Sequence, residues 1–291
     1  MECRNWKPEG WTVRFTKMNG AGNDFIVLDT IAEPLPWADA AQLAVRLCDR
    51  RRGIGADGLM ILAKPQGDAD LAMRFYNSDG SLGEMCGNGA RCVCRYACER
   101  GYAGDTVRVE TTAGLVTGWR QSRTEFRIRL NDPSVLDVEK LLEVDGKTYR
   151  CGYVVLGNPG IPHLTVEYPQ LADCDENALR ALGRKLRYHP ALPKGANVNF
   201  YEMVGTDTVL EKTYERGVED FTLACGTGTG SVAAVLTQSG RVSGKAVRVE
   251  TAGGTLRMDV TMENGRACGL LLTGPTVVAC TGEIGQELLE F

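Results

Sequence analysis

Two cysteine–glycine motifs are the residues of this sequence with the clearest potential for chemistry. Cys86-Gly87-Asn88-Gly89 and Cys225-Gly226-Thr227-Gly228 each place a cysteine before a glycine-rich turn that opens a predicted helix. Free backbone N–H groups at a helix start bind anions, and the helix dipole favours a thiolate there. Because glycines let a ligand approach the backbone closely, each motif predicts a reactive thiol beside a nest for a carboxylate.

Two such thiols, facing each other across a cleft, suit the inversion of an amino-acid α-carbon. One thiolate takes the α-proton from one face and the other thiol returns a proton to the opposite face, which is general acid–base catalysis. The amide nests would stabilise the charge that develops on the carboxylate. Two alternatives stay open: both cysteines are packing residues at tight turns, or one is a nucleophile with His163 as its base.

The two motifs belong to an internal repeat with an offset of about 140 residues. The segment Val-Arg-Val-Glu-Thr occurs at 107–111 and again at 247–251, and Gly-Ala-Asp at 55–57 matches Gly-Ala-Asn at 195–197. Because the matches keep the same order, we predict two similar halves from a duplication. Residues 1–134 carry Cys86, residues 148–291 carry Cys225, and the active site lies in the cleft between them.

Strand-like stretches outnumber helical ones, and no strict alternation of strand and helix appears. Apolar spacing predicts helices over 37–51 and 176–187, and helices over 90–100 and 230–238 follow the two motifs. The pattern favours an α+β fold with a mostly antiparallel sheet or barrel in each half. The predicted strands cover 12–17, 25–28, 59–62, 107–112 and 126–130, then 154–156, 164–168, 199–204, 209–214 and 247–250.

Composition excludes several classes of protein. The chain has 291 residues, a net charge of −4 and a pI near 5.4, which disfavours nucleic acid or an anionic membrane as partner. No apolar run reaches the ~20 residues of a membrane span, and Met1–Trp11 lacks the apolar core of a secretory signal. Eleven cysteines, an odd number without paired metal-ligand spacing, predict neither a disulfide framework nor a zinc site. We therefore expect a cytoplasmic protein.

At these residues the sequence resembles diaminopimelate epimerase, a family of cofactor-independent amino-acid epimerases. The resemblance runs from about Thr12 to Ile284. Besides the two cysteine motifs, its segments are 15–18 with 22–25, 53–58, 75–80, 157–159, 197–200, 215–217 and 223–224. The resemblance implies two α+β domains, each with a mostly antiparallel sheet or barrel wrapped around a central helix. It also implies that the enzyme needs neither a metal nor pyridoxal phosphate.

The same resemblance implies a role for each matching residue. Cys86 and Cys225 match the catalytic cysteines, and Gly87, Asn88, Gly226 and Thr227 match the nests around the reacting carboxylate. The positions that hold the substrate are matched by Asn23, Asn77, Asn158, Asn197, Glu215 and Arg216. The implied reaction converts LL-2,6-diaminopimelate to the meso form, for lysine and cell-wall precursor synthesis, in a homodimer. A guanidinium suits the distal carboxylate of that substrate, and a glutamate suits its ammonium group.

The sequence departs from the family pattern at three places. Asn19 stands where the family often has histidine, residues 160–162 separate Pro159 from His163, and Phe221 stands where glutamate is common. Two further hypotheses therefore stay open. The chain is a related two-cysteine racemase for another amino acid, or it is a non-catalytic amino-acid-binding protein on the same scaffold.

Overall fold

The computed structural model describes residues 12–35, 39–83 and 85–288. The predicted helix start at Trp37 and the segment Met1–Trp11 lie outside these residues. The chain forms two compact units. The first contains the residues up to Arg120 together with those from Thr276 onward, and the second runs from Gln121 to Pro275. Each unit is described by itself below.

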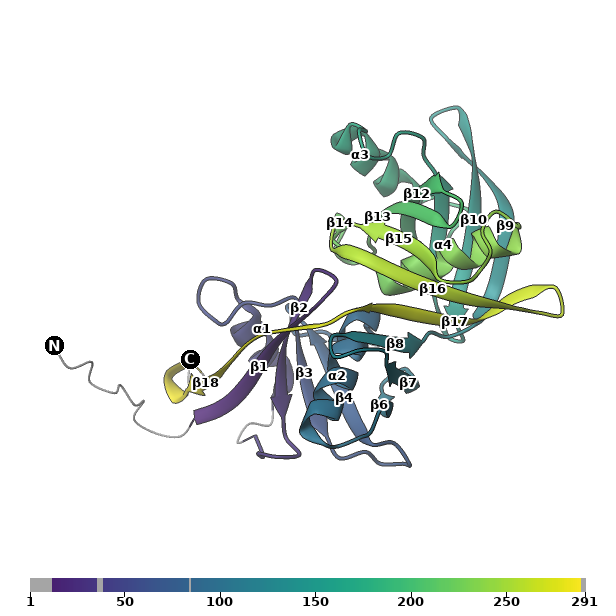
Figure 1. The fold of residues 1–291 in the computed structure, drawn as a ribbon. Helices are drawn as coiled ribbons and strands as arrows, with labels where there is room; N and C mark the ends of the chain where they lie inside the picture. The colour runs from purple at the N-terminus through teal and green to yellow at the C-terminus, as the bar shows by residue number, and fades with distance from the viewer. Residues whose placement is uncertain (1–11, 36–38, 84, 289–291) are drawn as a thin grey trace. The chain divides into compact units, whose positions relative to one another are not determined.

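The first unit is a mixed, mostly antiparallel sheet around helix α2 (Gly87–Arg100) (Figure 1). Its strands follow the spatial order β18 (Val277–Gly285), β1 (Thr12–Gly20), β2 (Asn23–Asp29), β3 (Gly58–Ala63), β4 (Leu71–Asn77), β6 (Thr106–Thr111) and β7 (Gly114–Arg120). Strand β5 (Leu82–Gly83) also pairs with β4, and among the described strands of this unit only β2–β3 and β4–β6 are parallel. Helix α1 (Ala40–Cys48) packs on β3 and β4, while α2 contacts β1, β2, β6 and β7.

The second unit repeats this plan around helix α4 (Gly226–Gln238). Its strands follow the order β8 (Glu125–Arg129), β17 (Arg266–Pro275), β16 (Gly254–Glu263), β15 (Val247–Thr251), β13 (Thr208–Tyr214), β12 (Asn197–Gly205), β11 (Gly160–Glu167), β10 (Lys147–Gly157) and β9 (Pro133–Val144). Strand β14 (Phe221–Thr222) pairs with β13, and helix α3 (Glu176–Arg187) packs on β12 and β13. The 3-10 turn at Gln286–Leu288, near the end of the chain, belongs to the first unit. Only β11–β12 and β13–β15 are parallel.

The duplication expected from the sequence is visible in the order of elements. From β1 to β9 the chain runs through two strands, a helix, three strands, a helix and four strands, and the same series recurs from β10 to β18. The predicted α+β class, with a mostly antiparallel sheet around a buried helix, is confirmed.

The edges of the units differ from the two sequence halves. Strands β8 and β9 of the first repeat belong to the second unit, where β9 pairs with β10. Strand β18 of the second repeat returns to the first unit and pairs with β1. Each repeat thus gives its last strand to the first strand of the other repeat, which satisfies backbone groups that an unpaired edge would leave open.

Helix bounds also differ from expectation, except for α3, which covers the predicted 176–187. Helices α2 and α4 begin at Gly87 and Gly226, before the predicted residues 90 and 230, so the glycines form the first helical turn. Helix α1 is shorter than predicted and is capped by Asp39, whose side chain accepts from the Gln42 N–H at 3.0 Å. Most strands extend beyond their predicted ends because pairing partners distant in sequence continue them.

Candidate functional site

The two cysteines occupy the same backbone position in the two units. Cys86 is the N-cap of α2 with φ −125° and ψ 112°, and Cys225 is the N-cap of α4 with φ −117° and ψ 105°. The first helical hydrogen bonds join the Ala90 N–H to the Cys86 carbonyl at 2.8 Å and the Thr229 N–H to the Cys225 carbonyl at 2.9 Å. Neither sulfur caps its helix. Each unit therefore places a thiol beside the open amides of a helix start, as the sequence predicted.

The third residue of each helix has no room for a side chain. A Cβ at Gly89 would lie 1.7 Å from the Met60 Cε, and one at Gly228 would lie 2.1 Å from the Asn199 Oδ1. Both neighbours lie on the strand beneath the helix, β3 in the first unit and β12 in the second. The glycines thus let the first turn of each helix press against the sheet.

In the first unit, Asn23 and Asn88 are joined directly. The Asn88 Nδ2 donates to the Asn23 Oδ1 at 2.5 Å, and the Asn23 Nδ2 donates to the Asp57 Oδ2 at 3.1 Å. Asn88 is buried at the helix start, next to Gly87. Asn77, at the end of β4, donates from its Nδ2 to the Ser81 Oγ at 2.9 Å. The structure therefore links two of the predicted residues and holds the third in a separate turn.

A charged cluster beside Asn23 was not predicted. Asp24 accepts from Lys17 at 2.9 Å and from Arg50 at 2.7 Å, and Arg50 also reaches Asp57 at 2.8 Å. Burial raises the pKa of Asp24, but hydrogen bonds from Arg50 and Lys17 outweigh that effect and lower it to about 2. Asp24 and Asp57 both lie in motifs that carry the family resemblance, and this was the sequence feature that could have indicated the cluster.

In the second unit, Cys225 is buried among groups that keep it protonated. Burial raises the pKa of the Cys225 thiol well above its ordinary value, and the negative charge of Glu215 raises it further. The Thr227 hydroxyl, 3.6 Å from the sulfur, and the backbone N–H of Gly228 act in the opposite direction. Cys225, Thr227 and Glu215 are therefore close neighbours. The raised pKa of Cys225 is opposite to the thiolate that the sequence analysis expected at this helix start.

Arg216 is held by its backbone and leaves its guanidinium exposed. Its N–H donates to the Asn197 Oδ1 at 2.7 Å, and its Nη1 donates to the Lys194 carbonyl at 3.3 Å. Among the described residues it has no carboxylate partner. Asn158 is exposed at the turn between β10 and β11, before a cis peptide bond to Pro159, and makes no hydrogen bond to the other predicted residues. Asn197 and Arg216 are thus brought together, while Asn158 stands apart.

A buried polar network under α4 was also missed. The Asn199 Nδ2 donates to the His163 Nδ1 at 3.3 Å, and the Thr213 hydroxyl donates to the Asn199 Oδ1 at 3.1 Å. Nearby, the Thr229 hydroxyl donates to the Glu211 Oε2 at 2.6 Å. Burial raises the pKa of Glu211 from 4.5 to about 7. The sequence feature that could have indicated this network is the presence of His163, Asn199 and Glu211 in three largely apolar strands.

His163 is ill suited to be the base of a cysteine nucleophile. Burial, together with the positive charge of Arg216, lowers its pKa to about 3. Within the described part of its own unit, it makes no hydrogen bond to Cys225. The hypothesis of a single nucleophilic cysteine activated by His163 is therefore not supported by the geometry.

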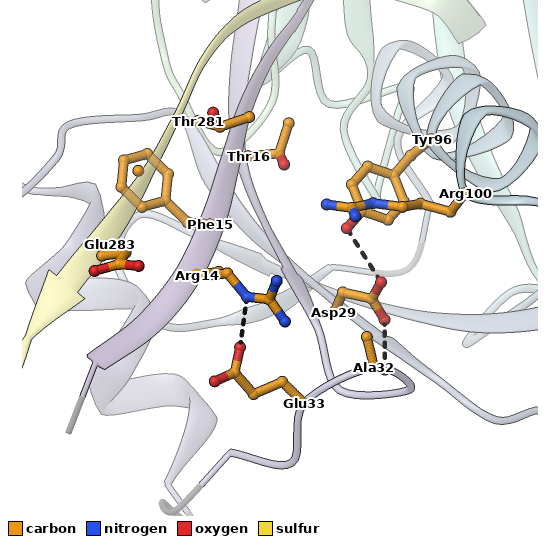
Figure 2. Close-up of a pocket in the computed structure, with 11 residues that line it drawn as sticks. Arg14, Phe15, Thr16, Asp29, Ala32, Glu33, Tyr96, Arg100, Thr281 and Glu283 are labelled. Atoms are coloured by element: carbon orange, nitrogen blue, oxygen red, sulfur yellow. Dashed lines mark hydrogen bonds and ion pairs between the residues drawn. The ribbon is translucent and has the colours of Figure 1, made fainter.

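One pocket of the first unit lies away from the predicted site residues. A hollow of about 320 Å³ in the first unit is lined by strands β1 and β18 and by the end of α2. Figure 2 shows Arg14 paired with Glu33, and the Tyr96 hydroxyl pointing at Asp29. None of the predicted site residues lines this pocket. Within the described ranges, no three His, Cys, Asp or Glu side chains are grouped as metal ligands, and no helix has the length and apolar content to cross a membrane.

The family model and the curated relatives that match this chain belong to the same family. The family model described as diaminopimelate epimerase matches residues 15–134 and 155–278. Among curated relatives, diaminopimelate epimerase of Aquifex aeolicus is 37% identical over 289 residues, covering 96% of this chain and 100% of the relative. That of Archaeoglobus fulgidus is 40% identical over 270 residues, covering 88% and 92%.

Solved structures share the fold at low identity. A hydroxyproline epimerase from Agrobacterium vitis superposes with a TM-score of 0.71 at 18% identity, covering 96% of this chain and 94% of that chain. A methylitaconate-delta-isomerase gives a TM-score of 0.66 at 13% identity, covering 94% and 95%. The duplicated fold and the match to the family model over most of its length lead to one conclusion. The chain belongs to the diaminopimelate epimerase family and is an isomerase of the epimerase type.

Proposed function

We propose that this enzyme inverts one α-carbon of LL-2,6-diaminopimelate to give the meso form, without a cofactor, in lysine and peptidoglycan precursor synthesis. The observation that carries the proposal is the matching pair of helix starts, each with a cysteine N-cap and open amides, in a chain of this family. The names of the curated relatives support the substrate.

In the proposed mechanism, Cys86 and Cys225 act on one carbon from opposite faces. One sulfur, as the thiolate, forms an S–H bond to the α-proton, and the C–H electron pair moves into the enolate-like carboxylate. The other thiol then gives its proton to the opposite face and becomes the thiolate. Protons and charge balance, and the two cysteines exchange protonation states with each turnover.

The remaining predicted residues would hold the substrate. The amides at Gly87, Asn88, Gly226 and Thr227 would bind the reacting carboxylate. Arg216, which lacks a carboxylate partner among the described residues, would bind the distal carboxylate, and Glu215 its ammonium group. The amides of Asn23, Asn77, Asn158 and Asn197 offer donors and acceptors for the same groups.

Exchange of the substrate α-hydrogen in heavy water, followed by chiral analysis of the product, tests the mechanism. We expect Cys86→Ala and Cys225→Ala each to abolish inversion, and the matched control Cys280→Ala, an exposed thiol on β18, to retain it. Unchanged inversion in either active-site variant would rule out the two-cysteine mechanism. Mild peroxide oxidation should join Cys86 to Cys225, and recovery of only free thiols in both peptides would contradict their facing each other.

A racemase for a different amino acid is the alternative that a specific observation favours. Residues 160–162 lie in strand β11, directly after the turn that holds Asn158, and depart from the family pattern. Turnover of proline or another amino acid, with none of diaminopimelate, would establish this alternative. Binding of diaminopimelate without turnover, under reducing conditions, would instead indicate a binding protein.

The resemblance also supports a homodimer in the cytoplasm. Light scattering coupled to size exclusion tests the first part, since a homodimer should give twice the 31.6 kDa mass of the chain. A monomer across a wide concentration range would contradict it.

A further inference from the structure

Arg91, one turn into helix α2, carries a completely buried positive charge. Its Nη1 donates to the Gly87 carbonyl at 3.3 Å and its Nη2 donates to the Asn88 Oδ1 at 2.8 Å. Its Nε has no hydrogen-bond partner, and no carboxylate pairs with it among the described residues. A buried guanidinium without a counter-charge is costly, so a negative group nearby has to balance it.

Among the described residues, three cysteines are the candidates for that negative group. Burial lowers the pKa of Arg91, and negative charge on Cys92, Cys86 or Cys94 would raise it. Burial raises the pKa of Cys92 to about 12 and raises that of Cys94 further, so both stay neutral thiols. Cys86 differs because it is only partly buried and lies at the positive end of the helix dipole. It is therefore the thiol best placed to carry the counter-charge.

Arg91 also begins a hydrogen-bond chain that has only one possible direction. The chain runs from Arg91 to the Asn88 Oδ1 at 2.8 Å, from Asn88 to Asn23 at 2.5 Å, and from Asn23 to Asp57 at 3.1 Å. A guanidinium can only donate and an ionised carboxylate can only accept. The two amides between them therefore cannot flip without losing a hydrogen bond, and Arg91 sets which atoms of Asn88 and Asn23 face each other.

The second unit lacks this cation. Arg91 lies five residues after Cys86, and the residue five after Cys225 is Gly230. The charges that bear on Cys225 are instead the carboxyls of Glu215 and Glu211. The two helix starts share a backbone geometry but have opposite electrostatic surroundings.

We propose that Arg91 is a positioning residue of the active site, in which its buried guanidinium balances the Cys86 thiolate and fixes the amides of Asn88 and Asn23. The inference rests on the proposed function, because it assigns Cys86 as the cysteine that is ionised before substrate arrives. It makes the resting enzyme asymmetric, with a thiolate in the first unit and a thiol in the second.

Alkylation by iodoacetamide across a pH series, with each cysteine followed in its own peptide, tests the proposal on the free enzyme. In the unaltered protein, the pH midpoint of Cys86 should lie at least about one unit below that of Cys225. Arg91→Gln, which keeps a donor but loses the charge, should raise the Cys86 midpoint by about one unit and leave Cys225 unmoved. Because Cys86 is ionised in the resting enzyme, the thiolate fraction at neutral pH, and with it kcat, then falls about two- to fivefold. Arg91→Lys keeps the charge and should move the midpoint by less than about half a unit.

Arg95→Met is the matched control, since Arg95 is also buried on α2 but bonds Glu99 at 2.8 Å and the Thr276 carbonyl at 2.6 Å. It should lower the melting temperature without moving the Cys86 midpoint. An unmoved midpoint in folded Arg91→Gln overturns the proposal, as does ionisation of Cys225 before Cys86 in the unaltered protein. If Arg91→Gln does not fold, the order in which Cys86 and Cys225 ionise in the unaltered protein, together with the midpoint in Arg91→Lys, decides whether the proposal holds. Because alkylation does not depend on turnover, the expected midpoints in a protein inactive on diaminopimelate would contradict the proposed function alone.

Discussion

Helices α2 and α4 lie on equivalent strands of the two units, but the side chains between helix and strands differ in polarity. Strand registers align Met60 with Phe75 in the first unit and Asn199 with Thr213 in the second. Phe25, which pairs with Gly58 in the first unit, is equivalent in this alignment to His163, which pairs with Asn197 in the second. The first unit is therefore apolar under its reactive helix, whereas the second unit buries a hydrogen-bonded polar network there.

The buried charges follow the same division. Arg91 and Asn88 lie on α2, whereas a carboxyl, Glu211, is bound by Thr229 under α4. Duplication thus preserved the backbone that presents each thiol, while the side chains around the two thiols diverged. Such divergence is what a pair of thiols needs if one is to be ionised while the other holds its proton.

Filling the space at the third helical residue should separate the two units most strongly. Gly228→Ala would force the Asn199 side chain, which is held by three hydrogen bonds, away from His163, Leu164 and Thr213. We expect a loss of about 3–4 kcal/mol in the free energy of unfolding, from overpacking and lost buried hydrogen bonds. Gly89→Ala meets the flexible end of Met60 and should cost only about 1 kcal/mol. Equal losses of unfolding free energy for the two variants in urea would contradict the difference between the two units.

The buried carboxyl of Glu211 should make stability depend on pH. Its pKa is raised from 4.5 to about 7, so the folded state binds the proton more tightly than the unfolded chain. Its contribution is fully present below pH 4.5 and is lost as the pH rises through 7, by roughly 3 kcal/mol. Glu211→Gln should therefore gain that much relative to the unaltered protein between pH 4.5 and 8. Urea unfolding at both pH values checks this, with Met73→Leu, at the matching position of β4, as a control without a pH effect.

His163 opposes Glu211 over part of the same range. Its pKa is lowered to about 3, so its contribution is present above pH 6.5 and is lost as the pH falls. The two slopes have opposite signs between pH 4.5 and 6.5, and the Glu211→Gln protein should show the histidine slope alone. A flat profile in that variant would count against the buried neutral imidazole.

Acid should weaken the first unit through Asp24. Hydrogen bonds from Arg50 and Lys17 outweigh burial and hold its pKa at about 2, below the ordinary 3.8. Its contribution, about 2 kcal/mol, is present above pH 3.8 and is lost as the pH falls through 2. Asp24→Asn should lower stability at pH 6 by about that amount and show little further loss in acid. An acid slope as steep as that of the unaltered protein would assign the effect to other carboxyls.

The smallest expected effect comes from making the second unit resemble the first at one side chain. Thr229→Ala introduces the residue that stands at position 90 on α2 and removes the 2.6 Å hydrogen bond to Glu211. We expect a cost of about 1 kcal/mol at pH 5, where Glu211 is protonated. The cost should grow above pH 7, where a charged acceptor loses its donor. Equal costs at pH 5 and pH 8 would contradict the assigned protonation.

Much of the fold could be predicted because its signals are local. Paired motifs revealed the duplication, and the leucine spacing of 176–187 gave α3 its full length. The cysteine N-caps followed from a cysteine placed before a glycine-rich turn that opens a predicted helix. Asp57 stands inside the segment 53–58 and Arg91 lies two residues after the first cysteine motif. Their partners, Asn23 and Asn88, were assigned to substrate alone, because a motif does not show which of its side chains are buried.

The sequence by itself determined the duplication, the family and the two cysteines at helix starts, because these depend on residue types and short spacings. Only the tertiary structure decided that β9 and β18 pair with the opposite repeat, since strand pairing depends on partners distant in the chain. It alone decided which charges are buried beside each thiol. Burial sets the cost of a charge, and burial is a property of the packed strands rather than of the neighbouring residues.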